Sequence, residues 1–522
     1  MTPENTEHRT EPRGILQLHE DILTEIFLWN ANIFTAKNCV VTTRSASQVC
    51  QSWRSILLCS SSVWGRLMDL DTLNQKSNAW RQEILSRSGQ SLLWIVGSKP
   101  STTSQSFLFD SLLSLHWERI EHLQIRNIMK YYLSSKAWDN LRRPAPNLRS
   151  CSLEWYSGAD QLFSESSAPL FADYAPLLCH FSVSHVKLDL NSAWFSNLRH
   201  LDFRFQLTTA DVLQTLQSMV HLEFLGISGD GEELLDDDRP SQLPTVVLPN
   251  LTELRLNHSS VNICSALLGH IRPADNCRLS FETSLDPKPH QSDLDQLSNS
   301  LSSLFRCYLH SQAHSIPQIH LMLLDSHCIF ECSPDIAKPW HVEHSSPKFK
   351  MCFYAWSHPI WTILPMLSTF DLSAIQKLHL MVNTQTNVFP SQKVLHFMSF
   401  FSRFSSVTHI ELQEVELHAI YPLSILADRQ PIFPRLQTLH LDTFNTLDHH
   451  HLLDFLRFRR DIGQPISTVF FAFLPNDREK NLGLKILDEI IGLRLHWYLD
   501  GKKFEHICGS NMSPSPLQLL ST

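Results

Sequence analysis

The sequence predicts an α/β protein in which a small N-terminal module of three helices precedes an irregular solenoid of strand-plus-helix or strand-plus-loop repeats. Two patterns predict this fold. The first 70 residues contain short apolar stripes at helical spacing, and the remainder repeats an apolar-x-x-apolar-x-apolar motif. Hydrophobic residues make up 43% of the 522-residue chain and charged residues only 18%, so there is ample material for a large core.

The helical module is expected over residues 15–70, after a disordered segment at 1–14. The segment LHEDILTEIFLWN has acidic residues in its first turn and an apolar stripe at helical spacing, made by Ile22, Leu23, Ile26 and Phe27. A second helix is expected in TTRSASQVCQSWRSILL, with one apolar face that runs from Ala46 to Leu57. A third short helix contains Trp64 and follows serines that can cap it.

The repeats are expected over residues 71–508. Copies of the motif begin at Ile120, Leu148, Leu178, Leu198, Leu222, Leu251, Ile316, Ile375, Val407, Leu436 and Ile466. Most neighbouring copies start about 20–32 residues apart, at or slightly above the period of leucine-rich repeats. Alternate residues of a strand share one face, so each copy predicts a short strand with two inward side chains. Stacked strands would then share a continuous core.

Three segments depart from the pattern. Residues 257–374 carry it poorly, which indicates an insertion or a distorted stretch. Residues 229–244 are acidic and Pro-containing, as in a solvated loop, and residues 509–522 are expected to be a disordered tail. Residues 482–499 read as a helix turning into a strand that caps the array.

Charge and composition exclude several function classes. Lys and Arg number 43 against 52 Asp and Glu, a net charge of −9 without a basic block, so nucleic acid is not an expected partner. No apolar run approaches 18 residues, and the N-terminus is polar, so neither a membrane span nor a targeting segment is expected. The 12 scattered cysteines read as reduced thiols of an intracellular protein, cytoplasmic or nuclear.

Chemistry-bearing motifs are few. The P-loop, nucleophile-elbow and H-E-x-x-H patterns are missing from the sequence, and glycine is scarce. Zinc-capable residue types occur in series at Cys328, Cys332, His341 and His344, but their spacing is not a standard one, and core thiols in a loop are the favoured interpretation. The triplet His449–His451 reads as a solvated helix start. We therefore expect no catalytic residue, no cofactor and no metal.

The N-terminal pattern resembles an F-box of the type found in large families of mushroom-forming fungi. The resemblance rests on Leu18–Phe27, on QVCQSWR at 48–54 and on SSVW at 61–64. It extends to residues 80–95, to 112–125, to the leucine-rich units and to 434–460, so it covers nearly the whole chain. One position differs, because His19 stands where the motif usually has proline after its opening leucine, and the spacing between the first two helices is long.

The resemblance implies the substrate-recognition subunit of a Skp/cullin/F-box ubiquitin ligase. Such a subunit binds a Skp-family linker, and through it a cullin, while its repeats capture a protein target. By position, the residues that match the linker-binding surface are Leu18, Ile22, Leu23, Ile26, Phe27, Val49, Trp53 and Trp64. Val49, Trp53 and Trp64 are equally readable as the core of the module. The adaptor needs no catalytic residue, because the chemistry belongs to the conjugating enzyme.

Two alternatives stay open. A degenerate F-box, indicated by His19, would leave a protein-interaction scaffold outside any ligase. An enzyme within residues 257–374 would have the Cys/His series as its only sequence signal. The strand positions that face solvent, such as Arg255, Glu411 and His440, do not concentrate one kind of chemistry in the sequence.

Overall fold

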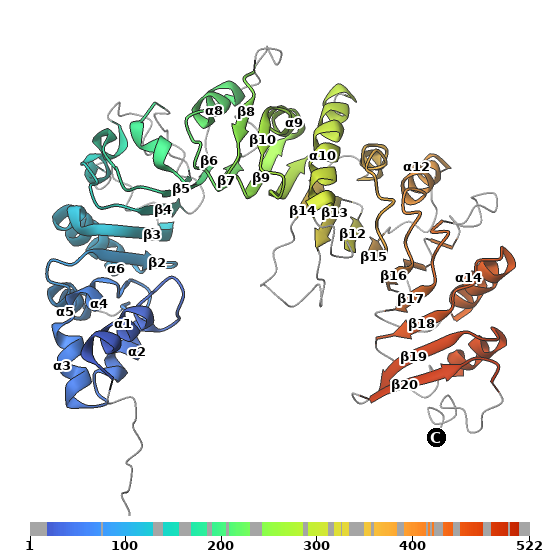
Figure 1. Cartoon of the computed structure of the whole chain (residues 1–522), viewed down its shortest axis with the longest axis horizontal. Helices are drawn as coiled ribbons and strands as arrows, with labels where there is room; N and C mark the ends of the chain where they lie inside the picture. The colour runs from blue at the N-terminus through green and yellow to red at the C-terminus, as the bar shows by residue number, and fades with distance from the viewer. Residues whose placement is uncertain are drawn as a thin grey trace, which may run out of the picture. The chain divides into compact units, whose positions relative to one another are not determined.

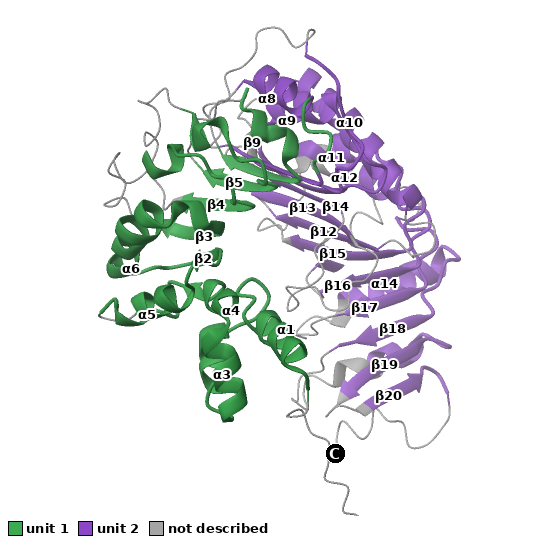
Figure 2. Ribbon diagram, turned by 60° about the vertical axis from the view of Figure 1, so that its left-hand side comes forward, with its two compact units in different colours: residues 1–205, 218–222 green, residues 206–217, 223–522 purple. Residues whose placement is uncertain are grey.

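The computed structural model is a mixed α/β structure dominated by parallel strands (Figure 1). The structure describes residues 18–74, 77–128, 139–155, 169–184, 191–204, 208–229, 243–285, 291–311, 318–324, 326–333, 349–355, 360–383, 391–413, 416–417, 420–421, 432–441, 449–472, 482–499 and 502–510. It divides into two compact units (Figure 2): residues 1–205 with 218–222, and residues 206–217 with 223–522. The predicted disordered N-terminus lies outside the described residues, as do most of the acidic loop and of the C-terminal tail.

The first unit begins with four short helices and continues into a parallel sheet. The helices are α1 (Glu20–Asn30), α2 (Cys39–Ala46), α3 (Gln51–Cys59) and α4 (Ser61–Gly65). The strands, in chain order, are β1 (Met68–Asp69), β2 (Leu93–Gly97), β3 (Ile120–Ile128), β4 (Ser150–Trp155), β5 (His180–Ser184) and β6 (His200–Arg204). Each strand pairs in parallel with the next. The connections contain α5 (Ala79–Arg87), α6 (Thr102–Phe107), the π-helix η2 (Leu108–Leu113) and the 3-10 helices η3 (Trp117–Arg119), η5 (Asp139–Arg142), η6 (Leu170–Asp173) and η7 (Ala193–Asn197).

The second predicted helix is two helices, which corrects the three-helix expectation. A turn at Ser47–Val49 separates α2 from α3, and Cys50 adopts an extended conformation as the N-cap of α3. Its sulfur accepts the Trp53 backbone N–H at 3.5 Å, so a cap interrupts what the periodicity presents as one stripe. Ser60 does not cap α4 with its side chain, since its hydroxyl donates to the Ile56 carbonyl oxygen instead.

The second unit carries the longer sheet. Its strands are β7 (Phe224–Ser228), β9 (Glu253–Ser260), β11 (Arg278–Ser284), β12 (Gln318–Leu324), β13 (His327–Ser333), β14 (Phe349–Tyr354), β15 (Lys377–Asn383), β16 (His409–Leu412), β17 (Thr438–Leu441), β18 (Thr468–Phe471), β19 (Arg494–Leu499) and β20 (Lys502–Ile507). Separately, β8 (Val246–Leu248) pairs with β10 (Ile271–Pro273). The helices are α8 (Thr209–Leu216), α9 (Val261–His270), α10 (Gln291–Ser311), α11 (Leu364–Leu367), α12 (Ser391–Phe401) and α14 (His449–Asp461), with 3-10 turns η9 (Ile360–Ile363) and η10 (Leu482–Glu489). The larger helices lie along one face of this sheet (Figure 1).

The motif positions form buried columns across parallel strands. In the first unit Leu123, Cys151, Phe181 and Leu201 pair in register, and each is at most 2% exposed. In the second unit a longer column contains Ile319, Leu378, Ile410, Leu439, Val469 and Leu495, also at most 2% exposed. The prediction that alternate residues of each copy face a shared core is confirmed at these positions.

The poorly patterned middle contains an antiparallel excursion. Spatially, β11 pairs with β14, β14 with β13, β13 with β12, and β12 with β15; the two central pairings, β14–β13 and β13–β12, are antiparallel. The chain therefore turns back twice between two parallel strands, without a return helix between β12 and β13. Each of these strands still buries alternate residues, but the spacing that marks a repeat is lost because two of them are joined by a tight reversal.

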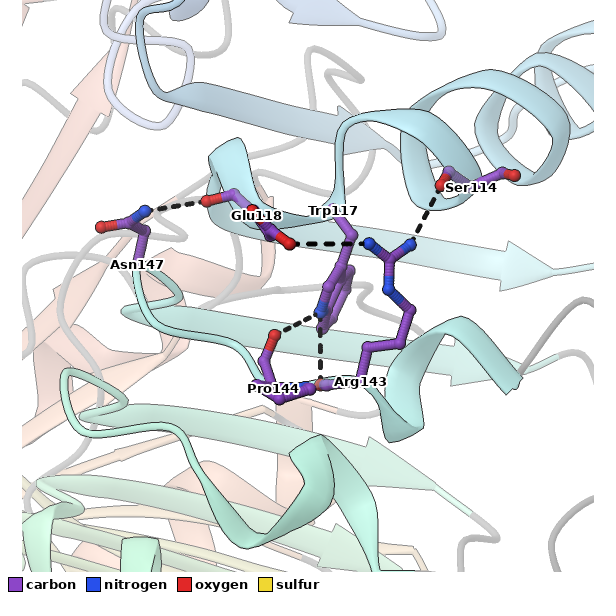
Figure 3. Close-up of polar contacts among 6 residues, drawn as sticks. All are labelled: Ser114, Trp117, Glu118, Arg143, Pro144 and Asn147. Carbon is purple, nitrogen blue, oxygen red and sulfur yellow. Dashed lines mark hydrogen bonds and ion pairs between the residues drawn. The ribbon is translucent and has the colours of Figure 1, made fainter.

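Side chains in the turns before β3 and β4 bind the backbone of the neighbouring turn. Figure 3 shows Asn147 Nδ2 donating to the Glu118 carbonyl oxygen at 2.8 Å, while Arg143 Nη1 donates to the Ser114 carbonyl oxygen at 3.0 Å. The buried Trp117 indole N–H donates to the carbonyl oxygens of Arg143 and Pro144, at 3.3 and 2.9 Å. Asn147 thus ties its repeat to the preceding repeat. It lies one residue before the motif, whereas the usual asparagine ladder of leucine-rich repeats would lie beyond the strand.

Replacing Trp117 by phenylalanine is expected to destabilise the first unit by about 1–2 kcal/mol more than the same change at Trp194. Both indoles are 2% exposed, but the Trp194 Nε1 has no hydrogen-bond partner among the described residues. The lost ring volume is therefore matched, and the difference isolates the donated hydrogen bonds. Urea unfolding followed by circular dichroism measures it. Equal losses in the two variants would contradict the assignment.

Candidate protein-binding surfaces

Helix α1 has two apolar faces, of which one is buried and the other exposed to solvent. Leu23 and Phe27, four residues apart, are each 3% exposed, and the Phe27 ring meets that of Trp53 edge-to-face with centroids 5.2 Å apart. Ile22 and Trp29 are 50% and 73% exposed, and Ile26 between them is partly exposed. Positions 22, 26 and 29 lie on one side of a helix. The helix therefore buries one stripe in the module and presents another to solvent.

His19 is the N-cap residue of this helix. Its Nδ1 accepts the Asp21 backbone N–H at 3.3 Å, which caps the helix, and Glu20 and Asp21 stand at the positive end of the helix dipole. The φ angle of His19 is −61°, within the range that a proline ring imposes. The backbone at this position is thus the one that proline favours, although the residue is histidine.

The remaining predicted contact residues divide between surface and core. Leu18 and Val49 are exposed, by 37% and 59%, and Trp53 is partly exposed. Trp64 is 2% exposed; its indole N–H donates to the Leu57 carbonyl oxygen, and the Arg87 guanidinium lies 4.6 Å from its ring centroid. Leu23, Phe27 and Trp64 are therefore core residues of the module and not contact residues, because side chains so deeply buried cannot offer area to a partner.

Sequence reasoning omitted Trp29, the most exposed large apolar side chain of the four helices. The available signal was its spacing, seven residues after Ile22 in the same amphipathic segment. Val41 and Leu58 are also exposed, by 53% and 45%. Exposed apolar side chains thus concentrate on these short helices, which is typical of a protein-interaction site.

The helical module packs on the first strands. The Phe34 ring lies 5.4 Å from the Trp94 ring on β2 and 5.2 Å from the His122 ring on β3, as centroid distances. The Arg66 guanidinium stands 4.5 Å from the Trp94 centroid and donates to the Leu28 carbonyl oxygen. Module and first strands belong to one compact unit.

A second candidate surface runs along the sheet of the second unit. From β9 to β19, the residue between two buried positions of each strand pairs in register with its counterpart on the next strand, and the row ends at Glu505 on β20. These residues, here called the strand-face row, are Arg255, Ser280, Lys350, Glu331, His320, His379, Glu411, His440, Phe470, His496 and Glu505. Because strand side chains alternate between faces, the row lies opposite the buried columns.

Neighbours in the row contact one another. Lys350 Nζ lies 3.3 Å from a Glu331 carboxylate oxygen, and His379 Nδ1 lies 3.3 Å from His320 Nε2. Further along, the Phe470 and His496 rings stack with centroids 4.5 Å apart. Burial lowers the pKa of His320 to about 4, so its imidazole is neutral at physiological pH. His379 and His496 are buried, at 7% and 9% exposed, and the other members are partly or fully exposed. The accessible part of the row offers hydrogen-bonding and ring surfaces of mixed charge, and strand register brings its members together.

The sequence-level metal and thiol candidates are core residues or undescribed. Cys328 and Cys332 lie on strand β13, not in a loop, and are fully buried. Burial raises the pKa of the Cys332 thiol to about 12, which keeps it protonated and unreactive. His341 and His344 lie outside the described residues. The histidine triplet is part of helix α14, which begins at His449.

No protein-family model matches the chain, and no curated protein matches it significantly. Within the described ranges, every helix is too short or too polar to cross a membrane.

Proposed function

We propose that this chain is the substrate-recognition adaptor of a Skp/cullin/F-box ubiquitin ligase, in which α1–α4 are an F-box and the strand-and-helix units are divergent leucine-rich repeats. The observation that carries the proposal is the solvent-facing apolar stripe of Ile22, Ile26 and Trp29 on the first of four small helices. The adaptor performs no bond chemistry of its own. It raises the local concentration of a bound target near the conjugating enzyme.

The stripe supports helix-mediated docking. A few large apolar anchors, rimmed by polar groups, supply most of the affinity at such interfaces. Val49 and the partly exposed Trp53 extend the apolar area to the start of α3. The strand-face row is proposed as the surface that binds the protein target, because it is polar, spans many strands and leaves the buried columns undisturbed.

Replacing Ile22 by aspartate is expected to weaken linker binding about 10–30-fold, since a charge would be desolvated at the centre of the apolar contact. The measurement is calorimetric titration of the full chain with a recombinant Skp-family linker from a mushroom-forming fungus. Leu115→Asp is the matched control, because Leu115 is 72% exposed in the same unit but lies outside the four helices. An equal loss in both variants would place the interface elsewhere.

The alternative, a scaffold with a degenerate F-box, makes a different prediction in the same titration. The intact chain would not bind the linker at micromolar concentration, which would refute the ligase assignment. His19→Pro then separates two causes. The φ angle of −61° admits proline, so binding gained by this variant would identify His19 as the reason for degeneracy.

A further inference from the structure

Three residues with metal-binding side chains converge at the C-terminal end of the second unit. Asp488 lies near the C-terminal end of η10. His506 lies on β20, and Cys508 follows His506 by two residues. Cys508 begins the turn after β20, and both His506 and Cys508 are buried. The Asp488 Oδ1 lies 2.8 Å from His506 Nε2, and the three ligand atoms all lie within 4.8 Å of one another.

The three side chains form a partly enclosed cluster. His506 and Cys508 are 5% and 1% exposed, whereas the Asp488 side chain is 46% exposed. The nitrogen and sulfur ligands are therefore shielded, and the Asp488 carboxylate is the ligand group that solvent reaches. Burial, with a smaller effect of the Asp488 charge, raises the pKa of the Cys508 thiol to about 12. A divalent cation would reverse that effect by stabilising the thiolate.

The backbone around the cluster fixes the ligands in place. The Gly509 N–H donates to Asp488 Oδ1 at 3.1 Å, and the Cys508 backbone exchanges hydrogen bonds with the η10–β19 connection through Gly492 and Leu493. Gly509 has a φ of +72°, and a Cβ there would approach Ile491 to 3.0 Å. A glycine is required for this turn, which brings Cys508 beside Asp488.

We propose that Asp488, His506 and Cys508 bind a zinc ion through one oxygen, one nitrogen and one sulfur atom, with a fourth position open to solvent. Mixed O, N and S donors suit Zn²⁺, whereas Ca²⁺ and Mg²⁺ require oxygen ligands. On binding, the Cys508 thiol releases one proton to solvent. The His506 imidazole takes the tautomer with its proton on Nδ1, so that Nε2, which faces Asp488, has a lone pair for the ion. The ion would link η10 to the terminal strand and so strengthen the cap that closes the sheet.

The test uses the full chain after chelator treatment, with Co²⁺ as a spectroscopic probe and Zn²⁺ for affinity. We expect one tight Co²⁺ per chain with a thiolate-to-cobalt charge-transfer band, displaced by one equivalent of Zn²⁺. Cys508→Ser removes the band. Cys59→Ser keeps it, because Cys59 is an exposed thiol that reports adventitious binding. Zinc is also expected to raise the thermal midpoint of the wild-type chain.

The Asp488→Asn variant decides the case if Cys508→Ser fails to fold. Asparagine keeps the shape and can still accept the Gly509 N–H, but it is a poor zinc ligand, so zinc affinity should fall about tenfold or more. Unchanged affinity in this variant would overturn the proposal. So would a charge-transfer band that persists in Cys508→Ser, or a wild-type midpoint that zinc does not move. In those cases the cluster is only a hydrogen-bonded Asp–His pair. Linker binding is scored separately, so the two proposals fail independently.

Discussion

Replacement of Arg459 by leucine is expected to lower the free energy of unfolding of the second unit by about 3–5 kcal/mol. Arg459 lies on α14 and is 1% exposed. Its Nε donates to the Gln464 carbonyl oxygen at 3.1 Å, and its two terminal nitrogens donate to backbone carbonyl oxygens of the turn before β17, those of Ile432, Phe433 and Leu436, at 3.2–3.4 Å. A charge-assisted hydrogen bond is worth roughly 1.5–3 kcal/mol, and leucine would leave several buried acceptors without their donor.

The charge itself is retained in the core. Burial lowers the pKa of the Arg459 guanidinium to about 10, so it stays protonated at neutral pH and serves as a fourfold donor. Arg460→Leu is the matched control: Arg460 is exposed and its nearest acidic partner is Asp461, 3.6 Å away. That variant should change stability by less than about 1 kcal/mol. Chemical denaturation with comparable losses at both positions would show that the carbonyl contacts contribute little.

Acidification is expected to destabilise the second unit between about pH 6.5 and pH 4, in part through His320. The imidazole lies on β12 between Glu331 and His379, and burial lowers its pKa from an ordinary 6.5 to about 4. Between pH 6.5 and pH 4, His320 therefore binds a proton in the unfolded chain but not in the folded chain. The stabilisation is present above pH 6.5 and is lost as the pH falls through 4. The shift corresponds to at most about 3 kcal/mol, and screening by solvent reduces this.

Urea midpoints measured across this pH range provide the check. In His320→Gln, whose amide does not titrate, the fall in stability between pH 6.5 and pH 4 should be smaller by about 1–2 kcal/mol. His310→Gln is the control, because His310 is exposed on α10. Identical pH profiles for the wild type and His320→Gln would mean that His320 is not held neutral by the fold.

Much of the fold follows from local pattern. The motif copies mark positions that the structure buries, such as Leu123 and Leu439, because alternate burial on a strand is a property of a few consecutive residues. The antiparallel excursion through β13 and β14 does not follow from pattern. Its strands have the same two-residue alternation, and their direction depends on pairing between distant segments. The break between α2 and α3 was missed for a related reason, since the apolar spacing continues through the cap at Cys50.

The candidate surfaces show the same division. The amphipathic first helix and its apolar residues follow from local sequence, because Ile22, Ile26 and Phe27 recur at helical spacing. Which face of this helix is covered depends on long-range packing: contact with α3 buries Phe27 and leaves Ile22 and Trp29 exposed. The strand-face row and the Asp488–His506–Cys508 cluster also depend on tertiary structure. Their members are neighbours through strand register or chain reversal, and such long-range pairing has no local signature.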